Sequence, residues 1–477
     1  MTIPKIRPAW YLVLGIAGIT AANLNVSLDL AGWVASVPLL MYLASTRGYR
    51  SRMLFLLALI VAWSICIAKI ITPPLPPLFI FLFSVPISLF HLPGYLLWSR
   101  FRNRRWSVFL FPAVMAVMEW IQYTFTPFAS WGVAAYSQAH SLAIMQTVSL
   151  FGMAGLSFLV YWVNACLAEM ALGKERTVAN WHSPLAAVVL LLAFGALRYE
   201  TGKLKSVDTL KVAATGTDSE VKGFPLPSKE SNDRVRSDLF RRTELAARSG
   251  AKLVVWNEAS TFVVPEEMQA WQDTLSTLAR RLNVVLVAAF VVPLSESPVL
   301  YENKYLFFDS TGALIQTYFK HQPVPGEPAV KGREPIAVHR MAGVNLGAAI
   351  CYDYDFPYLA REYGRLGADL VAVPASDWRG IDPLHSRMAA FRAVEQGHSI
   401  IRSTRFGLST AITPYGEMVA QMSSFDRNDR VMIAHLPVKS VDTLYSRTGD
   451  VFVYLCLGFI GFFIYNACGS PAKPEST

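Results

Sequence analysis

Eight long apolar runs dominate this chain of 477 residues, and seven of them follow one another closely within the first 199 residues. The hydrocarbon core of a membrane is about 30 Å thick and takes roughly 20 apolar residues per helix. Soluble domains rarely contain so many apolar runs in succession. The sequence therefore predicts a helical bundle that spans a membrane. The expected spans cover residues 9–24, 28–45, 53–71, 77–98, 107–125, 143–171, 183–198 and 450–468.

Lysine and arginine residues gather in alternate loops between these runs, whereas the loops at residues 23–29, 72–77 and 124–140 contain none. Loops rich in positive charge stay in the cytoplasm. Seven spans then place residues 200–449 on the outer face of the membrane, and the eighth span returns the C-terminus to the cytoplasm. The basic residues that give this orientation are Lys5, Arg7, Arg47, Arg50, Arg52, Arg100, Arg102, Arg104, Arg105, Lys174 and Arg176.

The composition agrees with a membrane protein, because 53% of the residues are hydrophobic and only 16% are charged. The formal net charge of +9 does not indicate a nucleic-acid-binding protein, since many of the positive residues lie in the short loops. The five cysteines show no metal-ligand spacing. We therefore expect neither a zinc site nor an iron–sulfur centre.

The polar segment before the last apolar run has the length of a separate globular domain. The chain thus divides into an N-terminal membrane bundle (1–199), an outer domain (200–449) and a closing span with a short tail (450–477). Short β patterns alternate with helical patterns in the outer domain, which indicates an α/β fold. Strands are expected at residues 210–214, 253–256, 284–292, 305–309, 346–350 and 370–374, and helices at residues 233–249, 266–282, 357–366 and 387–397.

Cys351 is the only cysteine outside an apolar run, and it follows the strand pattern at residues 346–350. A lone thiol in this domain is either a small buried hydrophobe or a nucleophile. Two other polar residues also follow strands: Glu258 comes after residues 253–256, and Lys320 precedes a turn rich in proline and glycine. Taken singly, Glu258 has the ordinary interpretation of a solvated cap, and Lys320 that of a surface charge.

Acyl transfer by a thiol uses these three residue types together. The thiolate is the nucleophile, but a free cysteine has a pKa near 8.5 and is mostly protonated at neutral pH. A carboxylate can accept the proton as general base. The oxyanion of the tetrahedral intermediate needs a cation or N–H donors. Spacing in the sequence does not show that Glu258, Lys320 and Cys351 converge, although strand ends on one edge of an α/β sheet are where sites gather.

The three segments, in this order, resemble the Glu-Lys-Cys triad of the nitrilase superfamily. The resemblance covers residues 208–437 and implies an αββα sandwich in which Glu258, Lys320 and Cys351 are catalytic. Further segments that match the superfamily lie at residues 376–378, 387–395, 407–409 and 413–417.

The membrane half resembles the apolipoprotein N-acyltransferases of that superfamily. Without the resemblance, its aromatic residues and glycines have the ordinary interpretation of interfacial anchors and helix-packing positions. Seven spans, an outer nitrilase domain and one closing span form the architecture of that family. The matching segments are residues 118–120, 130–132, 136–138 and 163–165, with Gly152 and Gly155.

The resemblance implies a ping-pong acyl transfer at the outer face of a bacterial inner membrane. Cys351 would take an acyl chain from a phospholipid donor, which the resemblance implies is phosphatidylethanolamine, and pass it to the α-amine of a diacylated lipoprotein. Glu258 would accept the thiol proton, while Lys320 and a backbone N–H near Tyr352 would hold the oxyanion. No metal, nucleotide or other cofactor is implied.

Three more residues are implied to support the substrate or the transition state: Glu327, Tyr352 and Asp353. The chain also departs from the family. The stretch between Lys320 and Cys351 is shorter than the family's lid, and residues 405–406 are Arg-Phe where a small polar residue or asparagine is expected. Such changes leave the triad intact and bear on substrate choice.

Three alternatives remain open from the residues. The first is a membrane-tethered amidase or hydrolase, in which water resolves the thioester. The second is a scaffold in which Cys351 is merely packed. The third is a catalytic Cys–His pair. No histidine of the outer domain lies in a recognisable local signature, so its histidines are taken as ordinary polar residues. The candidates are His321, His339, His385 and His398.

Overall fold

The computed structural model describes residues 7–24, 28–73, 75–173, 182–204, 208–217, 219, 221, 225–341, 343–426 and 430–469. The chain forms two compact units, one comprising residues 1–199 and 448–477 and the other residues 200–447. Lys5, Lys174 and Arg176, which contributed to the predicted orientation, lie outside the described residues.

The first unit is helical. Among the described residues, five of its helices have the length and apolar composition to cross a membrane: α4 (Tyr49–Ala68), α5 (Leu78–Phe101), α6 (Ser107–Phe125), α8 (Val148–Ala171) and α9 (His182–Leu204). Shorter apolar helices are α1 (Pro8–Ala22), α2 (Asp29–Gly32), α3 (Val37–Ser45) and α15 (Val451–Gly469). A helical bundle is confirmed, whereas the number of eight spans stays a prediction.

Two predicted spans are each divided in the structure. Residues 28–45 form α2 and α3, because Pro38 lacks an N–H and favours the first turn of a new helix. Residues 143–171 overlap α7 (Leu142–Met145) and α8, which are separated by a turn. Apolar composition extends across both breaks, so hydropathy alone does not reveal them.

The residues that carry the resemblance in the membrane half tie its segments together. Glu119 of α6 accepts hydrogen bonds from the Tyr161 hydroxyl (2.8 Å) and the Ala134 N–H (3.0 Å). Asn164 of α8 accepts from the Ser36 N–H (2.8 Å) and donates to the Gly32 carbonyl (2.9 Å). Buried polar side chains thus satisfy backbone groups between the helices.

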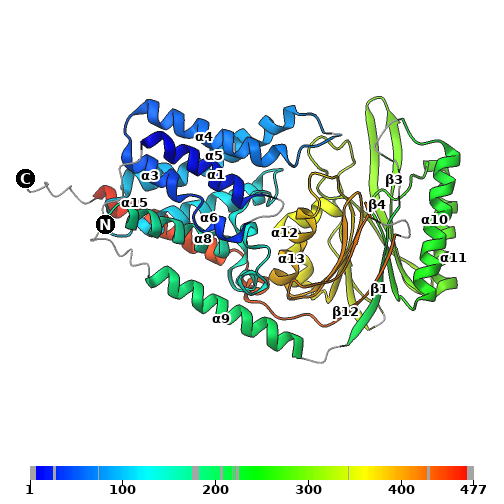
Figure 1. Cartoon of the computed structure of the whole chain (residues 1–477). Helices are drawn as coiled ribbons and strands as arrows, with labels where there is room; N and C mark the ends of the chain where they lie inside the picture. The colour runs from blue at the N-terminus through cyan, green and yellow to red at the C-terminus, as the bar shows by residue number, and fades with distance from the viewer. Residues whose placement is uncertain are drawn as a thin grey trace, which may run out of the picture. The chain divides into compact units, whose positions relative to one another are not determined.

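The second unit is a four-layer αββα sandwich, as predicted (Figure 1). The first sheet has the strand order β12-β1-β2-β3-β4-β5, and the second has the order β11-β10-β9-β8-β7-β6. Three strands at the centre of each sheet are parallel, β1-β2-β3 and β7-β8-β9, and the outer pairs are antiparallel.

The strands of the first sheet are β1 (Thr209–Thr215), β2 (Leu253–Trp256), β3 (Val285–Glu296), β4 (Val299–Phe308), β5 (Leu314–Phe319) and β12 (Val431–Pro437). Those of the second sheet are β6 (Val338–Met341), β7 (Val344–Ala348), β8 (Leu370–Ser376), β9 (Ser399–Arg405), β10 (Leu408–Ile412) and β11 (Met418–Ser423). The helices are α10 (Lys229–Arg248), α11 (Met268–Leu282), α12 (Pro357–Arg365), α13 (Leu384–Gln396) and α14 (Leu444–Thr448), with 3₁₀ turns η2 (Pro265–Glu267) and η3 (Cys351–Asp355).

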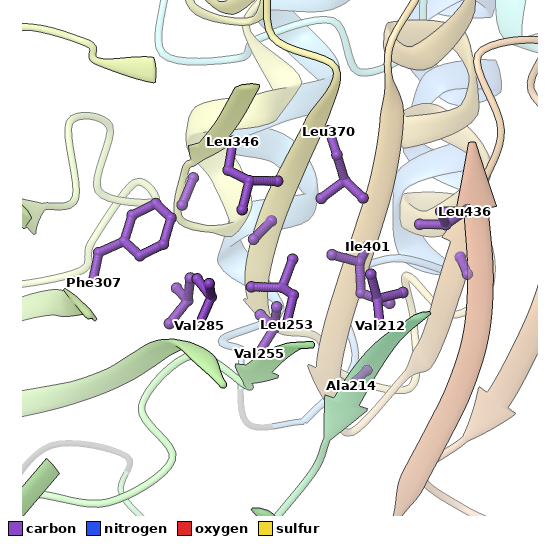
Figure 2. Packing of buried hydrophobic residues seen from close by; sticks show 14 of the residues in the cluster. Val212, Ala214, Leu253, Val255, Val285, Phe307, Leu346, Leu370, Ile401 and Leu436 are labelled. Carbon is purple, nitrogen blue, oxygen red and sulfur yellow. The ribbon is translucent and has the colours of Figure 1, made fainter. Parts of the chain in front are cut away.

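Alternating side chains of the two sheets meet in an apolar core, because successive residues of a strand point to opposite faces. The other face of the first sheet packs against α10 and α11, where Trp256 and Leu239 are buried. Helices α12 and α13 cover the second sheet. Figure 2 shows the core between the sheets, with Val212, Leu253, Val285 and Phe307 from one sheet and Leu346, Leu370 and Ile401 from the other.

All six predicted strands and all four predicted helices of this unit correspond to observed elements, with boundaries shifted by a few residues. The predicted strand at residues 284–292 continues to Glu296, and the strand at 305–309 begins earlier, at Val299. Together β3 and β4 form a long antiparallel hairpin. Its outer half mixes polar residues with the exposed Leu294 and Leu300, so it lacks the continuous apolar run that marks a buried strand.

Candidate active site

The three predicted catalytic residues follow strands that end in the interior of the sandwich. Glu258 comes after β2, Lys320 directly after β5, and Cys351 shortly after β7 at the start of η3. All three are buried, with 3%, 2% and 4% of their surface exposed. Two of them come from the first sheet and one from the second, so the packing of the sheets brings them to one region.

Lys320 lies between two carboxylates. Its Nζ donates to Glu258 Oε1 and to Glu327 Oε2, each at 2.8 Å. Asn303 of β4 links the same two carboxylates, since its Nδ2 donates to Glu258 (2.7 Å) and to Glu327 (2.9 Å). The Val324 N–H supplies a further hydrogen bond to Glu327. The arrangement fixes the Glu258 carboxylate and the Lys320 ammonium relative to each other.

The ionisation states follow from this cluster. Burial alone would lower the pKa of Lys320, but Glu258 and Glu327 outweigh it and hold that pKa well above its ordinary value. Burial would likewise raise the pKa of Glu327, yet Lys320 and the hydrogen bonds from Asn303 and Val324 lower it. Lys320 is therefore a permanent cation and Glu327 its permanent counter-ion at neutral pH.

Cys351 occupies a constrained turn. Its φ is +47°, in the left-handed region that side chains other than glycine rarely adopt. Its thiol makes one long contact, 3.8 Å from Sγ to the carbonyl of Ser376. Burial raises the pKa of the Cys351 thiol well above its ordinary value, and the nearby Glu258 raises it further while Lys320 opposes the rise. The resting thiol is thus protonated and needs a base before it can react.

Asp353 is a structural link between the Cys351 turn and the segment that carries Lys320. Its carboxylate accepts the Gln322 N–H (2.6 Å), the Tyr318 hydroxyl (2.9 Å) and the Ile350 N–H (3.3 Å). The side chain is fully buried, and burial raises the pKa of Asp353 to about 6. The predicted supporting role of Asp353 is compatible with these bonds, which position the nucleophile's turn.

Replacement of Asp353 by asparagine is expected to destabilise the domain by about 1–3 kcal/mol, because an amide nitrogen cannot accept the hydrogen bonds that one carboxylate oxygen receives. Denaturant unfolding of the purified protein measures the change. Asp273→Asn is a matched control, since Asp273 is exposed and bonds only Gln269 within its own helix. Equal stability of Asp353→Asn and the control would contradict the linking role.

Tyr352 lies next to the nucleophile and is 7% exposed. Its ring packs edge-to-face on Phe356, with ring centroids 5.3 Å apart. Its ring is therefore held against Phe356, and its predicted role, a backbone N–H beside the oxyanion, stays a prediction.

A second buried charge cluster lies beside Cys351, and it includes His385, which the sequence alone indicated to be an ordinary polar residue. His385 Nδ1 is 2.7 Å from Asp377 Oδ1, and its Nε2 is 2.9 Å from Asp355 Oδ1. Arg402 forms two hydrogen bonds to Asp377, of 2.6 and 3.0 Å. Burial would lower the pKa of His385, but the two carboxylates raise it to about 9. His385 is therefore a cation at neutral pH and cannot act as the base of Cys351.

The same cluster contains the donor atoms of Cys351, Asp377 and His385, which lie within 4.8 Å of one another. Thiolate sulfur, imidazole nitrogen and carboxylate oxygen are donor types that bind transition metals. Both ring nitrogens of His385 already face carboxylates, however, and Arg402 places a fixed positive charge on Asp377. A metal ion would have to displace these contacts, so the residues do not fit a metal centre.

His385 is expected to make the stability of the domain depend on pH. Its folded pKa lies above the value near 6.5 of an unfolded chain, so its contribution is complete below pH 6.5 and lost as the pH rises towards 9. The loss amounts to about 3 kcal/mol. Unfolding free energies measured from pH 6 to 10 should fall less steeply in His385→Gln than in the parent. Parallel curves would contradict the assignment.

Two residues near the site escaped the sequence analysis. Asn303 lies within β4, where nothing in the local pattern distinguishes it from any polar strand residue. Arg405 ends β9 and is 6% exposed. In the sequence, Arg405 stood out only because residues 405–406 depart from the family pattern. That departure was the signal that could have identified it as a residue of the site.

Comparison with known proteins shows the family of the chain. The sequence model of the carbon-nitrogen hydrolase family matches residues 200–445, which is more than half of the chain. The chain belongs to the carbon-nitrogen hydrolase family. A second model, that of the N-terminal domain of apolipoprotein N-acyltransferases, matches residues 15–166.

Relatives of this carbon-nitrogen hydrolase are described as apolipoprotein N-acyltransferases. The apolipoprotein N-acyltransferase of Borreliella burgdorferi is 24% identical over 68% of each chain. That of Bradyrhizobium diazoefficiens is 25% identical over 78% of this chain and 77% of its own. The resemblance to apolipoprotein N-acyltransferases is thereby confirmed.

Solved structures resemble the second unit. An amidase from Nesterenkonia sp. is 19% identical and covers 53% of this chain and 97% of its own, with a TM-score of 0.40. Nit3 of Saccharomyces cerevisiae, of branch 10 of the nitrilase superfamily, is 22% identical over 51% of this chain and 95% of its own, with a TM-score of 0.42.

Proposed function

We propose that this carbon-nitrogen hydrolase transfers an acyl chain from a membrane phospholipid to the N-terminal α-amine of S-diacylglyceryl-cysteine lipoproteins. The reaction takes place at the outer face of a bacterial inner membrane. The observation that carries the proposal is the buried Glu258–Lys320–Glu327 cluster beside Cys351, in a chain that also matches the acyltransferases' own N-terminal domain.

In the first half-reaction, Cys351 Sγ attacks the ester carbonyl of the phospholipid and its proton passes to Glu258. Protonation neutralises Glu258, which weakens the hold of that carboxylate on Lys320. The Lys320 ammonium then stabilises the oxyanion at the moment that the oxyanion forms. Glu258 returns the proton to the departing glycerol oxygen, and a lysophospholipid leaves behind an acyl-thioester on Cys351.

In the second half-reaction, the α-amine of the lipoprotein attacks the thioester carbonyl. Glu258 removes a proton from the amine, and the proton goes to the thiolate that leaves when the amide forms. Both substrates carry acyl chains, and each buried CH₂ contributes about 0.8 kcal/mol to membrane partitioning. A protein with apolar helices that reach across the bilayer therefore meets both substrates where they reside.

The purified protein, incubated with a phospholipid carrying deuterated acyl chains and a diacylated lipopeptide, tests the proposal. We expect a deuterated amide on the peptide N-terminus by mass spectrometry. A lipopeptide whose α-amine is acetylated is the matched control and should remain unmodified. Release of free deuterated fatty acid with no N-acylated peptide would overturn the proposal and indicate hydrolysis.

A further inference from the structure

Arg405 is an unusual cation in the wall of the site. It is the last residue of β9 and pairs with Ser376, the last residue of β8. Its Nε donates to Ser376 Oγ, and its Nη1 and Nη2 donate to the carbonyls of Ser219 and Val221, each at 2.8 Å. Only 6% of the surface of Arg405 is exposed.

The three hydrogen-bond acceptors of this guanidinium are neutral oxygens, and the Phe406 ring lies 5.4 Å from its central carbon. Within the part of the chain that the structure describes, no carboxylate lies at ion-pair distance from Arg405. Burial lowers the pKa of Arg405 to about 10, so it remains charged at neutral pH. A buried cation without a counter-ion is costly, and other arginines of this sandwich at similar depth, Arg392 and Arg402, are paired with carboxylates.

The charge of Arg405 acts on the reacting atoms. Ser376 connects Arg405 with the Cys351 thiol. The Ser376 hydroxyl accepts a hydrogen bond from Arg405, and the Ser376 carbonyl is the contact of the thiol. The carboxylates of Glu258 and Glu327, and Cys351 once it is ionised, partly offset the effect of burial on the pKa of Arg405. The cation therefore stands close to the place where the thiolate and the oxyanion form.

We propose that Arg405 is a charge-balancing and specificity-determining residue of the Cys351 site, which makes the surroundings of the sulfur attract negatively charged reagents and acyl donors. Near Cys351, the cations Lys320, His385 and Arg402 face five carboxylates, those of Glu258, Glu327, Asp353, Asp355 and Asp377. Arg405 offsets this excess of negative charge. It lets a thiolate form and an anionic donor approach at lower cost in a poorly screened interior.

Alkylation of Cys351 tests the charge independently of acyl transfer. Iodoacetate is an anion and iodoacetamide is neutral, but both react in the same way: Sγ forms a bond to the methylene carbon, iodide leaves, and the thiol proton passes to Glu258. The ratio of the two rate constants therefore reports the local field. A purely structural role for Arg405 would change both rates together and leave the ratio unchanged.

Three variants separate charge from structure. Arg405→Met removes the charge and should lower the iodoacetate-to-iodoacetamide ratio by about ten-fold. Arg405→Lys keeps the charge but loses the bonds to the Ser219 and Val221 carbonyls, so its ratio should stay near that of the parent. Arg248→Gln removes an exposed arginine of α10 as the matched control. An unchanged ratio in Arg405→Met, or an equal fall in both Arg405 variants, would overturn the proposal.

The donor preference rests on the proposed function and has its own measurement. Initial rates of lysophospholipid release are compared for phosphatidylglycerol, which is anionic, and phosphatidylethanolamine, which is zwitterionic, in detergent micelles of equal composition. The parent and Arg405→Lys should favour the anionic donor several-fold more than Arg405→Met does. Equal preferences in all three would overturn the donor inference. Absence of release from either donor would instead contradict the acyl transfer, while the alkylation ratio would remain interpretable.

Discussion

Replacement of Cys351 by serine is expected to abolish the acyl-enzyme and to lower N-acylation by at least about 10³-fold. A hydroxyl is far less acidic than a thiol, and Glu258 cannot ionise it to a useful extent. Intact-mass measurement after exposure to phospholipid detects the adduct directly. The parent should gain the mass of one acyl chain, and Cys351→Ser should gain none.

The fold should survive this change. Among the described residues, the one hydrogen bond of the Cys351 thiol is a long one of 3.8 Å to the Ser376 carbonyl, and serine is smaller than cysteine. We expect a stability change within about 1 kcal/mol. Cys456→Ser, which also removes a buried thiol but in α15, is the matched control and should retain the adduct. An undiminished adduct in Cys351→Ser would refute the role of this residue as nucleophile.

Replacement of Glu258 by glutamine is expected to slow acylation of Cys351 by about 10²–10⁴-fold at neutral pH. The amide has nearly the same shape but cannot accept the thiol proton. Burial keeps the pKa of the Cys351 thiol high, so the reaction depends on this base. Lys320 would still retain Glu327 as its counter-ion.

Single-turnover acylation rates measured from pH 6 to 10 provide the test. The rate of Glu258→Gln should climb with pH over this range, because solvent must then remove the thiol proton. Glu267→Gln is the control, since Glu267 is partly exposed and pairs with Arg236 away from the triad. A near-normal rate of the Glu258 variant at pH 7 would show that another group is the base.

The sequence was sufficient for the architecture and for the strand ends that carry chemistry. Glu258 and Cys351 each follow a short apolar strand pattern, and such patterns survive in the sequence because burial on both faces requires them. Lys320 instead follows β5, a half-buried edge strand that was not among the predicted strands. The αββα arrangement came from the resemblance rather than from periodicity. Breaks within the apolar runs of the membrane half were not visible, since the residues on either side of each break are equally apolar.

Contacts between side chains from distant strands could not be predicted. Asn303 bridges two carboxylates only because β4 lies beside β5, and its own neighbours in the sequence do not distinguish it. His385 was taken as ordinary, and its position between Asp377 and Asp355 depends on where α13 packs. Side-chain convergence of this kind depends on three-dimensional packing, which a one-dimensional pattern does not encode.

The strand order of the first sheet has a consequence for biogenesis. Strand β12 is the last of the domain to be synthesised, yet it pairs with β1, the first. The first sheet is therefore incomplete until translation has passed Pro437. Since Glu258 and Cys351 follow strands of opposite sheets, the proposed base and nucleophile come together only when the two sheets pack, so the site is completed late in folding.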